Sequence, residues 1–406
     1  MTVRVAYLIP EFPGQTHIWM WREIEHLRQW GVEVCIFSTR PPALRDRARH
    51  VFAEAARGET TYVGRCGPAL FAACVWALAT RPLALLGCIR LALALPVEGR
   101  GRWRKLLPLV VPACLLARRL ERRGVEHLHC HTCANGAILA MMNKRLTGIP
   151  YSLTLNANLE WWGGGMAQKL GQASFTIAIA QWLLDQVRRD FPQLGPDQVL
   201  LGRIGVDTRK WVPVPRHGNR DGGPARIVSV GRLTASKGFD ILLRALRRVR
   251  QSGQDVTLRI IGAGPEHAAL EALAVELGLH DAVQFLGSLA EEEIITELRT
   301  ADLFVLASHA EPLGVVYMEA MALGVAAVGT AAGGVGEIIR DGDNGLLAPP
   351  ADADLLAERV IRLVRDCGLR ERLGAAGRRT IVADFDSRLG AAVLFERLTG
   401  RRPELA

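Results

Sequence analysis

Two basic residues, Arg232 and Lys237, flank a predicted turn between a strand over residues 226–233 and a helix over residues 238–251. The first turn of a helix leaves backbone N–H groups unpaired, and the helix dipole favours an anion there. Arginine offers a planar fork to phosphate oxygens, and lysine offers a mobile point charge. The pair therefore predicts a phosphate site, although two ordinary solvated cations at a helix start would also explain it.

Two carboxylates, Glu311 and Glu319, lie eight positions apart after a predicted buried strand over residues 302–307. We expect a helix over residues 312–323 with Pro312 in its first turn, which would separate the carboxylates by roughly 12 Å along the helix. That separation is similar to the reach from the ribose of a nucleotide to a sugar beyond its diphosphate. The spacing is common by chance, but its combination with Arg232 and Lys237 at another strand end of the same sheet is specific.

Other polar and glycine motifs suggest chemistry less strongly. Gly333 and Gly334 could let the backbone approach a substrate closely, or could form a plain entry turn to a helix. The Asp341-Gly342-Asp343 run has the residues of a Mg²⁺ or Mn²⁺ site, but the Asn344-Gly345 that follows predicts a turn. The segment 129–133, His-Cys-His-Thr-Cys, lacks a second pair of zinc ligands, and we expect a strand end that lines a cleft. We therefore predict no metal site.

These residues need a framework, and the alternation of strand-like and helix-like runs supplies it. We expect strands in the first half over 3–9, 32–37, 125–130, 151–155, 175–179 and 199–203, and in the second half over 226–233, 256–262, 283–287, 302–307 and 325–330. Helices of about 10–15 residues between strands predict parallel sheets with both faces covered. The fold class is therefore α/β, with two doubly wound, Rossmann-like domains facing across a cleft between the carboxyl ends of their strands.

The composition of the chain suggests where the domains meet. Residues 207–224 are rich in Pro, Gly and polar residues, which predicts a linker. We expect an N-terminal acceptor-side domain over 1–206 with an insertion at about 66–123, a nucleotide-binding domain over 225–383, and a C-terminal helix over 384–406 that packs back on the first domain.

The net charge of +9 is concentrated in that insertion. Between residues 81 and 123 the chain has only two acidic residues against ten basic ones, which are Arg81, Arg90, Arg100, Arg102, Arg104, Lys105, Arg118, Arg119, Arg122 and Arg123. A local excess of this kind argues against a nucleic-acid-binding protein. Next to apolar runs it predicts an amphipathic segment that docks on an anionic membrane surface, although a pair of core-packing helices with a solvated arginine face would have the same composition.

Location follows from what the 406 residues contain. The apolar run from 66 to 96 is interrupted by Arg81 and Arg90, so we expect no transmembrane helix. We recognise no signal peptide, and the eight cysteines then favour a reducing compartment. We expect a cytoplasmic protein that is peripheral on the inner face of the cell membrane.

The motifs together resemble the family 4 retaining glycosyltransferases of the GT-B fold, and in particular members that build bacterial exopolysaccharides and surface glycans. The resemblance rests on Gly231-Arg232, Lys237-Gly238, the Glu311–Glu319 pair and the runs 10–17, 22–24, 204–207 and 332–337. It implies that a sugar moves, with retention and without a metal, from a UDP- or GDP-sugar to a glycan or lipid-linked acceptor.

The resemblance also implies roles for residues. Arg232 and Lys237 would hold the donor diphosphate, Glu319 the ribose hydroxyls, and Glu311 the hydroxyls of the transferred sugar. Backbone at Gly14, Gly314, Gly333 and Gly334 would approach the donor. Asn156 would also be a catalytic residue, and it stands where the family usually has a histidine. Asparagine forms hydrogen bonds but takes no proton at neutral pH. Two alternatives stay open: a nucleotide-sugar epimerase of related fold, and a non-catalytic relative that binds nucleotide sugars.

Overall fold

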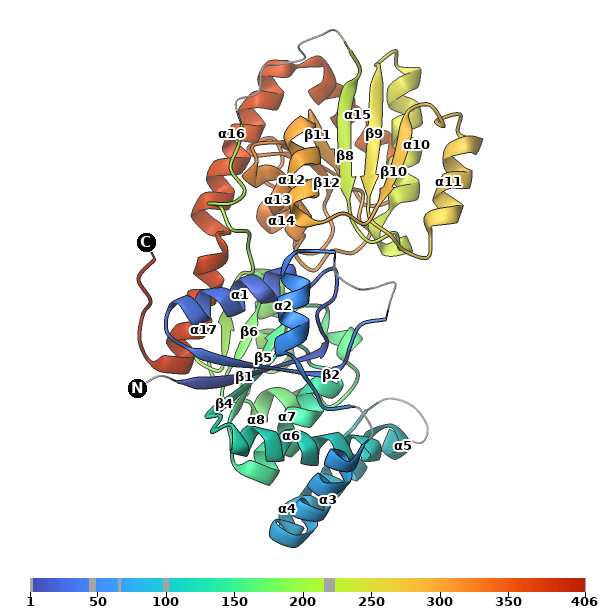
Figure 1. Ribbon diagram of the computed structural model, residues 1–406. Helices are drawn as coiled ribbons and strands as arrows, with labels where there is room; N and C mark the ends of the chain where they lie inside the picture. Colours follow the sequence, from blue (N-terminus) through green and yellow to red (C-terminus); the bar gives the residue numbers. More distant parts are fainter. Residues whose placement is uncertain (1–2, 44–48, 65–66, 98–101, 215–222, 406) are drawn as a thin grey trace. The chain divides into compact units, whose positions relative to one another are not determined.

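The computed structural model describes residues 3–43, 49–64, 67–97, 102–214 and 223–405 (Figure 1). It divides the chain into two compact units, Met1–Arg203 with Gly390–Ala406, and Ile204–Leu389. Of the segment 207–224, Thr208 and Trp211 are buried within the second unit, and residues 215–222 lie outside the described part of the chain.

The first unit is built on one parallel sheet, which has seven strands within the described residues. Their order is β3-β2-β1-β4-β5-β6-β7, and their bounds are β1 (Arg4–Glu11), β2 (Glu33–Arg40), β3 (Thr61–Tyr62), β4 (His127–Cys130), β5 (Tyr151–Leu155), β6 (Thr176–Ala178) and β7 (Val199–Leu201). Every residue of β5 is buried, as expected for a central strand that is covered on both faces.

Helices cover both faces of this sheet. They are α1 (Ile18–Gln29), α2 (Phe52–Glu59), α3 (Pro68–Thr80), α4 (Pro82–Ala94), α5 (Arg102–Leu106), α6 (Val110–Arg122), α7 (Asn135–Thr147), α8 (Met166–Gln172), α9 (Gln181–Asp190) and α17 (Ser387–Thr399), with short 3-10 turns η2 (Leu107–Leu109) and η3 (Leu159–Trp162). Met20 and Ile24 of α1 share a core with Leu394 and Phe395 of α17. On the other face, α7 lies against the sheet with α6 packed beside it, and α3 and α4 form a further layer outside them (Figure 1).

The second unit repeats the plan with six parallel strands within the described residues, in the order β10-β9-β8-β11-β12-β13. The strands are β8 (Ala225–Val230), β9 (Val256–Ile261), β10 (Val283–Gly287), β11 (Leu303–Val305), β12 (Ala326–Thr330) and β13 (Leu346–Ala348). The helices are α10 (Phe239–Gln251), α11 (His267–Glu276), α12 (Glu291–Thr300), α13 (Val315–Ala322), α14 (Val335–Ile338), α15 (Ala353–Arg365) and α16 (Cys367–Asp384), with the 3-10 turn η4 (Ala235–Lys237). The prediction of two doubly wound α/β domains is confirmed.

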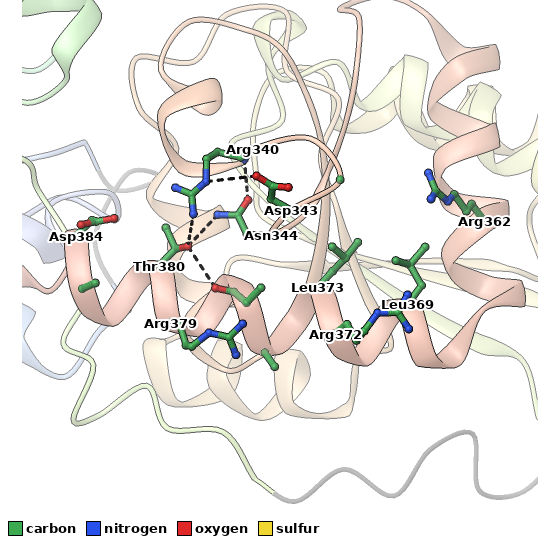
Figure 2. A pocket seen from close by; sticks show the side chains of 14 residues that line it. Arg340, Asp343, Asn344, Arg362, Leu369, Arg372, Leu373, Arg379, Thr380 and Asp384 are labelled. Atoms are coloured by element: carbon green, nitrogen blue, oxygen red, sulfur yellow. Dashed lines mark hydrogen bonds and ion pairs between the residues drawn. The ribbon is translucent and has the colours of Figure 1, made fainter.

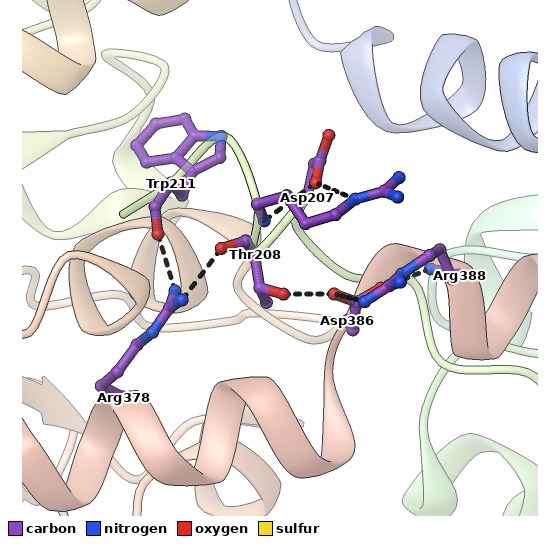
Figure 3. Close-up of polar contacts among 7 residues, drawn as sticks. Asp207, Thr208, Trp211, Arg378, Asp386 and Arg388 are labelled. Atoms are coloured by element: carbon purple, nitrogen blue, oxygen red, sulfur yellow. Dashed lines mark hydrogen bonds and ion pairs between the residues drawn. The ribbon is translucent and has the colours of Figure 1, made fainter. Parts of the chain in front are cut away.

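The chain passes between the units twice, and the two connecting segments pair with each other inside the second unit. Val206 bridges to Asp386, and the amide of Ser387 donates to the carbonyl of Val206 at 2.9 Å. Asp386 in turn accepts hydrogen bonds from Thr208 and from Arg388 (Figure 3). Burial raises the pKa of Asp386, but the hydrogen bonds from Arg388 and Thr208 outweigh burial and lower it.

Candidate active site

Lys237 is held by a turn that only glycine permits. Strand β8 ends at Val230, η4 covers Ala235–Lys237, and Gly238 then starts α10 with a φ of +60°. A Cβ on Gly238 would lie 2.0 Å from the carbonyl oxygen of Ala307, just beyond β11. The absence of a side chain therefore lets the turn after β8 approach the end of β11 closely.

An ion pair between Lys237 and Glu311 joins the turn after β8 to the loop after β11. The side chain of Lys237 is 21% exposed and that of Glu311 is 8% exposed, so the pair is partly shielded from water. The hydroxyl of Ser308 lies 3.4 Å from the same carboxylate oxygen, and the amide of His309 donates to the carbonyl of Ser236 at 2.8 Å. These contacts join the loop after β11 to the turn after β8.

Gly333 and Gly334 position the backbone of Glu311. The amide of Gly334 donates to the carbonyl of Glu311 at 2.9 Å. Gly333 has a φ of +53°, and a Cβ there would lie 2.3 Å from that same carbonyl oxygen. A third loop, the one after β12, thus holds Glu311 in place, which is a structural task for these glycines beside the close approach to substrate that the sequence suggested.

Helix α13 begins later than predicted. The expected start at Pro312 is wrong, because Gly314 has a φ of +102° and caps a helix whose first residue is Val315. Glu311 therefore lies on the loop before the helix, and the estimate of its distance from Glu319 along a helix axis does not apply. Glu319 lies in the second turn of α13 and is 7% exposed.

Tyr317 stabilises the loop that carries Glu311. Its hydroxyl donates to the carbonyl of Leu306 at 2.7 Å, and its ring occupies the space beside Gly314 and Gly329. Burial, together with the negative charge of Glu311, raises the pKa of Tyr317 well above its ordinary value. The phenol therefore stays neutral and remains a hydrogen-bond donor.

The site can receive an anion. The side chain of Arg232 is exposed and forms no hydrogen bond or ion pair in the described part of the chain. Neither α10 nor α13 has a side-chain cap at its N-terminus, where Gly238 and Gly314 stand. Unpaired N–H groups at helix starts, an exposed arginine and a lysine that can exchange its carboxylate partner are suited to a phosphate group.

The remaining predicted site residues lie in the first unit. Asn156 follows β5, and its side-chain amide donates to the carbonyl of His131 at 3.2 Å. The amide of Gly14 donates to Nδ1 of His17 at 3.0 Å. The structure thus gathers seven of the predicted residues in the second unit, namely Arg232, Lys237, Glu311, Gly314, Glu319, Gly333 and Gly334.

Sequence reasoning missed a buried polar network beside Asn156. Oε1 of Glu23 on α1 accepts a hydrogen bond from the hydroxyl of Tyr7 at 2.9 Å, and it lies 2.9 Å from Nε2 of His131. Both ring nitrogens of His129 lie within hydrogen-bond distance of hydroxyl groups, at 2.8 Å from Ser152 and 3.0 Å from Thr154. The only signal was alternate histidines at the end of a strand, because nothing in the sequence pairs them with Glu23.

Metal-ligating atoms come together here in an unexpected set. Glu23, His129 and His131 bring one ligand atom each within 4.8 Å of one another, whereas Cys130 and Cys133 are both buried as thiols. Burial raises the pKa of Cys130 to about 12. The hydroxyls of Tyr7, Ser152 and Thr154 contact Glu23 and His129, and Nε2 of His131 lies next to Glu23, so the described contacts join the set into a buried polar network. Elsewhere, Asp341 and Gly345 pair across a tight turn, as predicted.

A cavity of about 980 Å³ lies elsewhere in the second unit, along α16 (Figure 2). Four arginines line it: Arg340, Arg362, Arg372 and Arg379. The guanidinium of Arg340 donates to the hydroxyl of Thr380 at 3.2 Å and lies 4.0 Å from Asp343. None of the predicted site residues line this cavity.

Comparison with known protein families matches most of the second unit. Residues 214–380 match the family model described as glycosyl transferases group 1. A GDP-mannose-dependent alpha-(1-6)-phosphatidylinositol monomannoside mannosyltransferase of Mycolicibacterium smegmatis is 34% identical over 211 residues, which are 49% of this chain and 55% of that protein. A glycogen synthase of Mycobacterium tuberculosis is 34% identical over 281 residues, 66% of each chain. A putative colanic acid biosynthesis glycosyltransferase, WcaL, of Salmonella typhimurium is 31% identical over 198 residues, 47% of this chain and 48% of that protein. The chain thus spans about half to two thirds of the length of these relatives.

Solved structures resemble the whole chain. HepE of Anabaena, solved with UDP and glucose, has a TM-score of 0.71 at 18% identity and covers 98% of this chain and 100% of its own. A sucrose-phosphate synthase of Thermosynechococcus elongatus has a TM-score of 0.74 at 21% identity, covering 98% and 99%. At such identities the likeness concerns the fold, and it confirms the predicted GT-B architecture of two Rossmann-like domains.

Proposed function

Because residues 214–380 match the family model of glycosyl transferases group 1, we propose that the protein transfers a sugar from a nucleotide sugar to a glycan acceptor. The product is an exopolysaccharide or another surface glycan. The single observation that carries this proposal is the meeting of Lys237 and Glu311, where the ends of β8 and β11 converge next to two uncapped helix starts.

The proposed roles of the site residues follow from their charges. Departure of the nucleoside diphosphate leaves two negative phosphates and an oxocarbenium-like sugar. Arg232 and Lys237 bind the diphosphate and stabilise its charge as the bond breaks. When the donor binds, Lys237 exchanges part of its contact with Glu311 for a phosphate oxygen, and Glu311 is then available to the hydroxyls of the sugar. Glu319 holds the ribose.

We propose retention of configuration without a metal ion. The cations and helix starts supply the charge stabilisation that a divalent ion supplies in other transferases. Asn156 can donate a hydrogen bond to the donor sugar but cannot act as an acid or base, so the proposed reaction does not require proton transfer at that position.

The nature of the substrates is proposed from the relatives. One relative is named for its dependence on GDP-mannose and for a phosphatidylinositol-linked acceptor, and one structural neighbour was solved with UDP. We propose a UDP- or GDP-sugar as donor, a lipid-linked glycan as acceptor, and a place for the enzyme on the cytoplasmic face of the membrane, where both substrates meet.

A panel of UDP- and GDP-sugars, assayed for hydrolysis with and without a chelator, tests the proposal. We expect one donor to be hydrolysed equally in both conditions, with the released sugar first appearing in the anomeric form of the donor by NMR. Lys237→Ala and Glu311→Gln should each lower kcat/KM by on the order of a hundredfold.

Lys210 provides a matched control, since it forms an ion pair with the equally buried Glu291 outside the site. Lys210→Ala should lower stability while leaving kcat/KM close to that of the wild type. Equal losses of activity in Lys237→Ala and Lys210→Ala would mean that ion pairing matters only for folding. Appearance of an epimerised donor sugar would replace the proposal with an epimerase.

A further inference from the structure

Helices α3 and α4 form an outer hairpin on the first unit. Helix α3 packs against α6, and α4 packs against α7 (Figure 1). Arg81, between the two helices, anchors the hairpin: it donates to the carbonyl of Leu146 at 3.0 Å and to the carboxylate of Glu121 at 2.8 Å. The hairpin is therefore a fixed part of the fold, with one side against the domain and the other side turned outward.

Its side chains are arranged in the reverse of a normal surface helix. The buried positions hold mostly small residues: Ala73 and Ala77 in α3, with Cys88, Leu91 and Ala92 in α4. Six large apolar residues are exposed, with Leu83 83% exposed, Phe71 74%, Leu78 64%, and Val75, Leu93 and Leu86 between 42% and 48%. A helix that faced water would place such residues inward, and an apolar patch of this kind marks an interaction surface.

Charge favours a lipid surface as the occupant. The sequence has no aspartate or glutamate from residue 60 to residue 97. Exposed cations adjoin the apolar face, with Arg90 on α4 and with Arg104 and Lys105 on α5, which contacts α4. Anionic headgroups complement this rim. In a symmetric dimer through the same face, these cations would instead meet the same basic rim of the second copy.

The basic stretch itself is less available than its sequence suggested. Arg81 is committed to Leu146 and Glu121, and Arg123 donates to Thr61 at 2.8 Å while its guanidinium lies over Phe37. Arg118 and Arg119 are only partly exposed. Arg100 and the side chain of Arg102 lie outside what the structure describes. The apolar face, and not the number of cations, is the dominant exposed feature.

The hairpin does not have the dimensions of a membrane span. No single helix in the described part of the chain is long and apolar enough to cross a membrane; α3 and α4 pass that test only jointly, and they are bent by 112°. Each has 13 residues and is about 20 Å long, against roughly 30 Å for the hydrocarbon core. We propose that the outer face of α3 and α4 inserts into the interfacial layer of an anionic bilayer, with Phe71, Leu78 and Leu83 among the acyl chains. The inference makes the membrane location proposed above specific, but it rests on this surface alone.

Flotation with lipid vesicles tests the insertion directly. The full chain is mixed with vesicles of phosphatidylcholine, with or without phosphatidylglycerol, at low and high salt. We expect binding to both kinds, tighter to the anionic vesicles, and retention of much of the binding at high salt. The triple variant Phe71→Ser, Leu78→Ser, Leu83→Ser should lose binding by about tenfold or more, because burial of apolar side chains provides the affinity.

A second triple variant controls for the loss of exposed apolar surface elsewhere. Val51→Ser, Val275→Ser and Val382→Ser change residues that are 79%, 66% and 46% exposed outside the hairpin, and binding should stay at the wild-type level. Both variants should melt like the wild type, since no buried side chain changes.

Three results would overturn the inference. The first is equal vesicle binding by the hairpin variant and the wild type, and the second is complete release by high salt, which would indicate adsorption through charge alone. The third is a lipid-free dimer that the hairpin variant dissociates, with no vesicle binding by either protein. Vesicle binding by a chain that hydrolyses no donor would contradict the proposed function and still support the insertion.

Discussion

Lys237 and Glu311 are 74 positions apart in the chain, yet their side chains form an ion pair. Each residue alone is unremarkable, because lysines at helix starts and glutamates after strands are common. Their chemistry arises because the fold brings them together. Lys237 is a cation that can leave one anion for another, and Glu311 is a carboxylate whose backbone is fixed by the loop after β12. At this scale the site is a set of exchangeable contacts.

His127 and His129 lead to a pH prediction at the same scale. Burial lowers the pKa of His127 to about 4, and burial, His131 and His127 lower that of His129 well below its ordinary value. The unfolded chain has both pKa values near 6.5, so between about pH 6.5 and pH 4 it binds protons that the folded chain does not. The free energy of unfolding should therefore fall as pH falls, by up to about 1.4 kcal/mol per pH unit for each histidine.

The variant His127→Asn isolates one of the two protons. Urea unfolding of the first unit, followed across that pH range, should show a slope that is smaller by up to about 1.4 kcal/mol per pH unit than in the wild type. His280→Asn changes an exposed histidine in the second unit and should leave the first unit's transition as it was. A slope that His127→Asn does not alter would mean that this ring is charged in the folded protein.

Sequence reasoning succeeded with residues whose neighbours are dictated by topology. Parallel strands bring their carboxyl ends to one edge of a sheet, so Lys237 and Glu311 could be assigned to one region from the sequence, and they form an ion pair. The contact between Glu23 and His131 could not be predicted, because it depends on which side of α1 faces the end of β4. That depends on packing, which no local pattern specifies.

At the scale of elements, the glycine loop after β12 is the part that most directly supports Glu311. Gly333→Ala would strain a backbone with a φ of +53° and force a Cβ against the carbonyl of Glu311. The loop must then move, and the hydrogen bond from Gly334 to Glu311 should break. We expect donor hydrolysis to fall by on the order of a hundredfold, because the carboxylate no longer lies against Lys237.

Gly253→Ala is the matched control for this prediction. Gly253 has a φ of +80°, but a Cβ there would meet nothing within 4 Å. Gly253→Ala should lower the free energy of unfolding by about 1–2 kcal/mol through backbone strain alone, with kcat/KM within about twofold of the wild type. Measuring kcat/KM and the melting temperature of both variants separates strain from displacement. Similar activities in the two variants would contradict the positioning role of Gly333.

The elements show where periodicity is informative and where it fails. Strands β5 and β10 have the predicted bounds, since apolar residues alternate there with Ser152 and Thr154 and with Gln284, between turn signals. Strands β3 and β13 have only two and three residues and are too short to show a period. The hairpin of α3 and α4 lies on the surface as expected, but its outer face is not polar. A uniformly apolar helix gives no signal of which side is buried, so only the structure could reveal the reversed pattern.

At the scale of the whole molecule, the two crossings between the units are joined to each other and to α16. The guanidinium of Arg378 donates to three carbonyl oxygens, those of Trp211 at 2.6 Å, Ala322 at 2.8 Å and Thr208 at 2.9 Å. Trp211 is fully buried and Thr208 nearly so. One side chain therefore fixes the first connecting segment to the second unit, next to the pairing of Thr208 with Asp386 (Figure 3).

Arg378→Ala should loosen this connection, because it leaves three carbonyl groups without their charged donor. Each such loss costs about 1–3 kcal/mol when the group stays buried, and relaxation with water entry reduces the sum, so we expect about 2–4 kcal/mol in the unfolding of the second unit. Hydrogen exchange at the amides of Lys210 and Trp211 should accelerate with it, since both donate to the carbonyl of Asp207 in the loosened segment.

The neighbouring Arg379→Ala removes an exposed arginine from the same helix and should change stability by less than about 0.5 kcal/mol. If exchange in this segment were equally fast in both variants, the connection would be held by the pairing of Val206 with Asp386 alone, and Arg378 would be only a surface contact of α16.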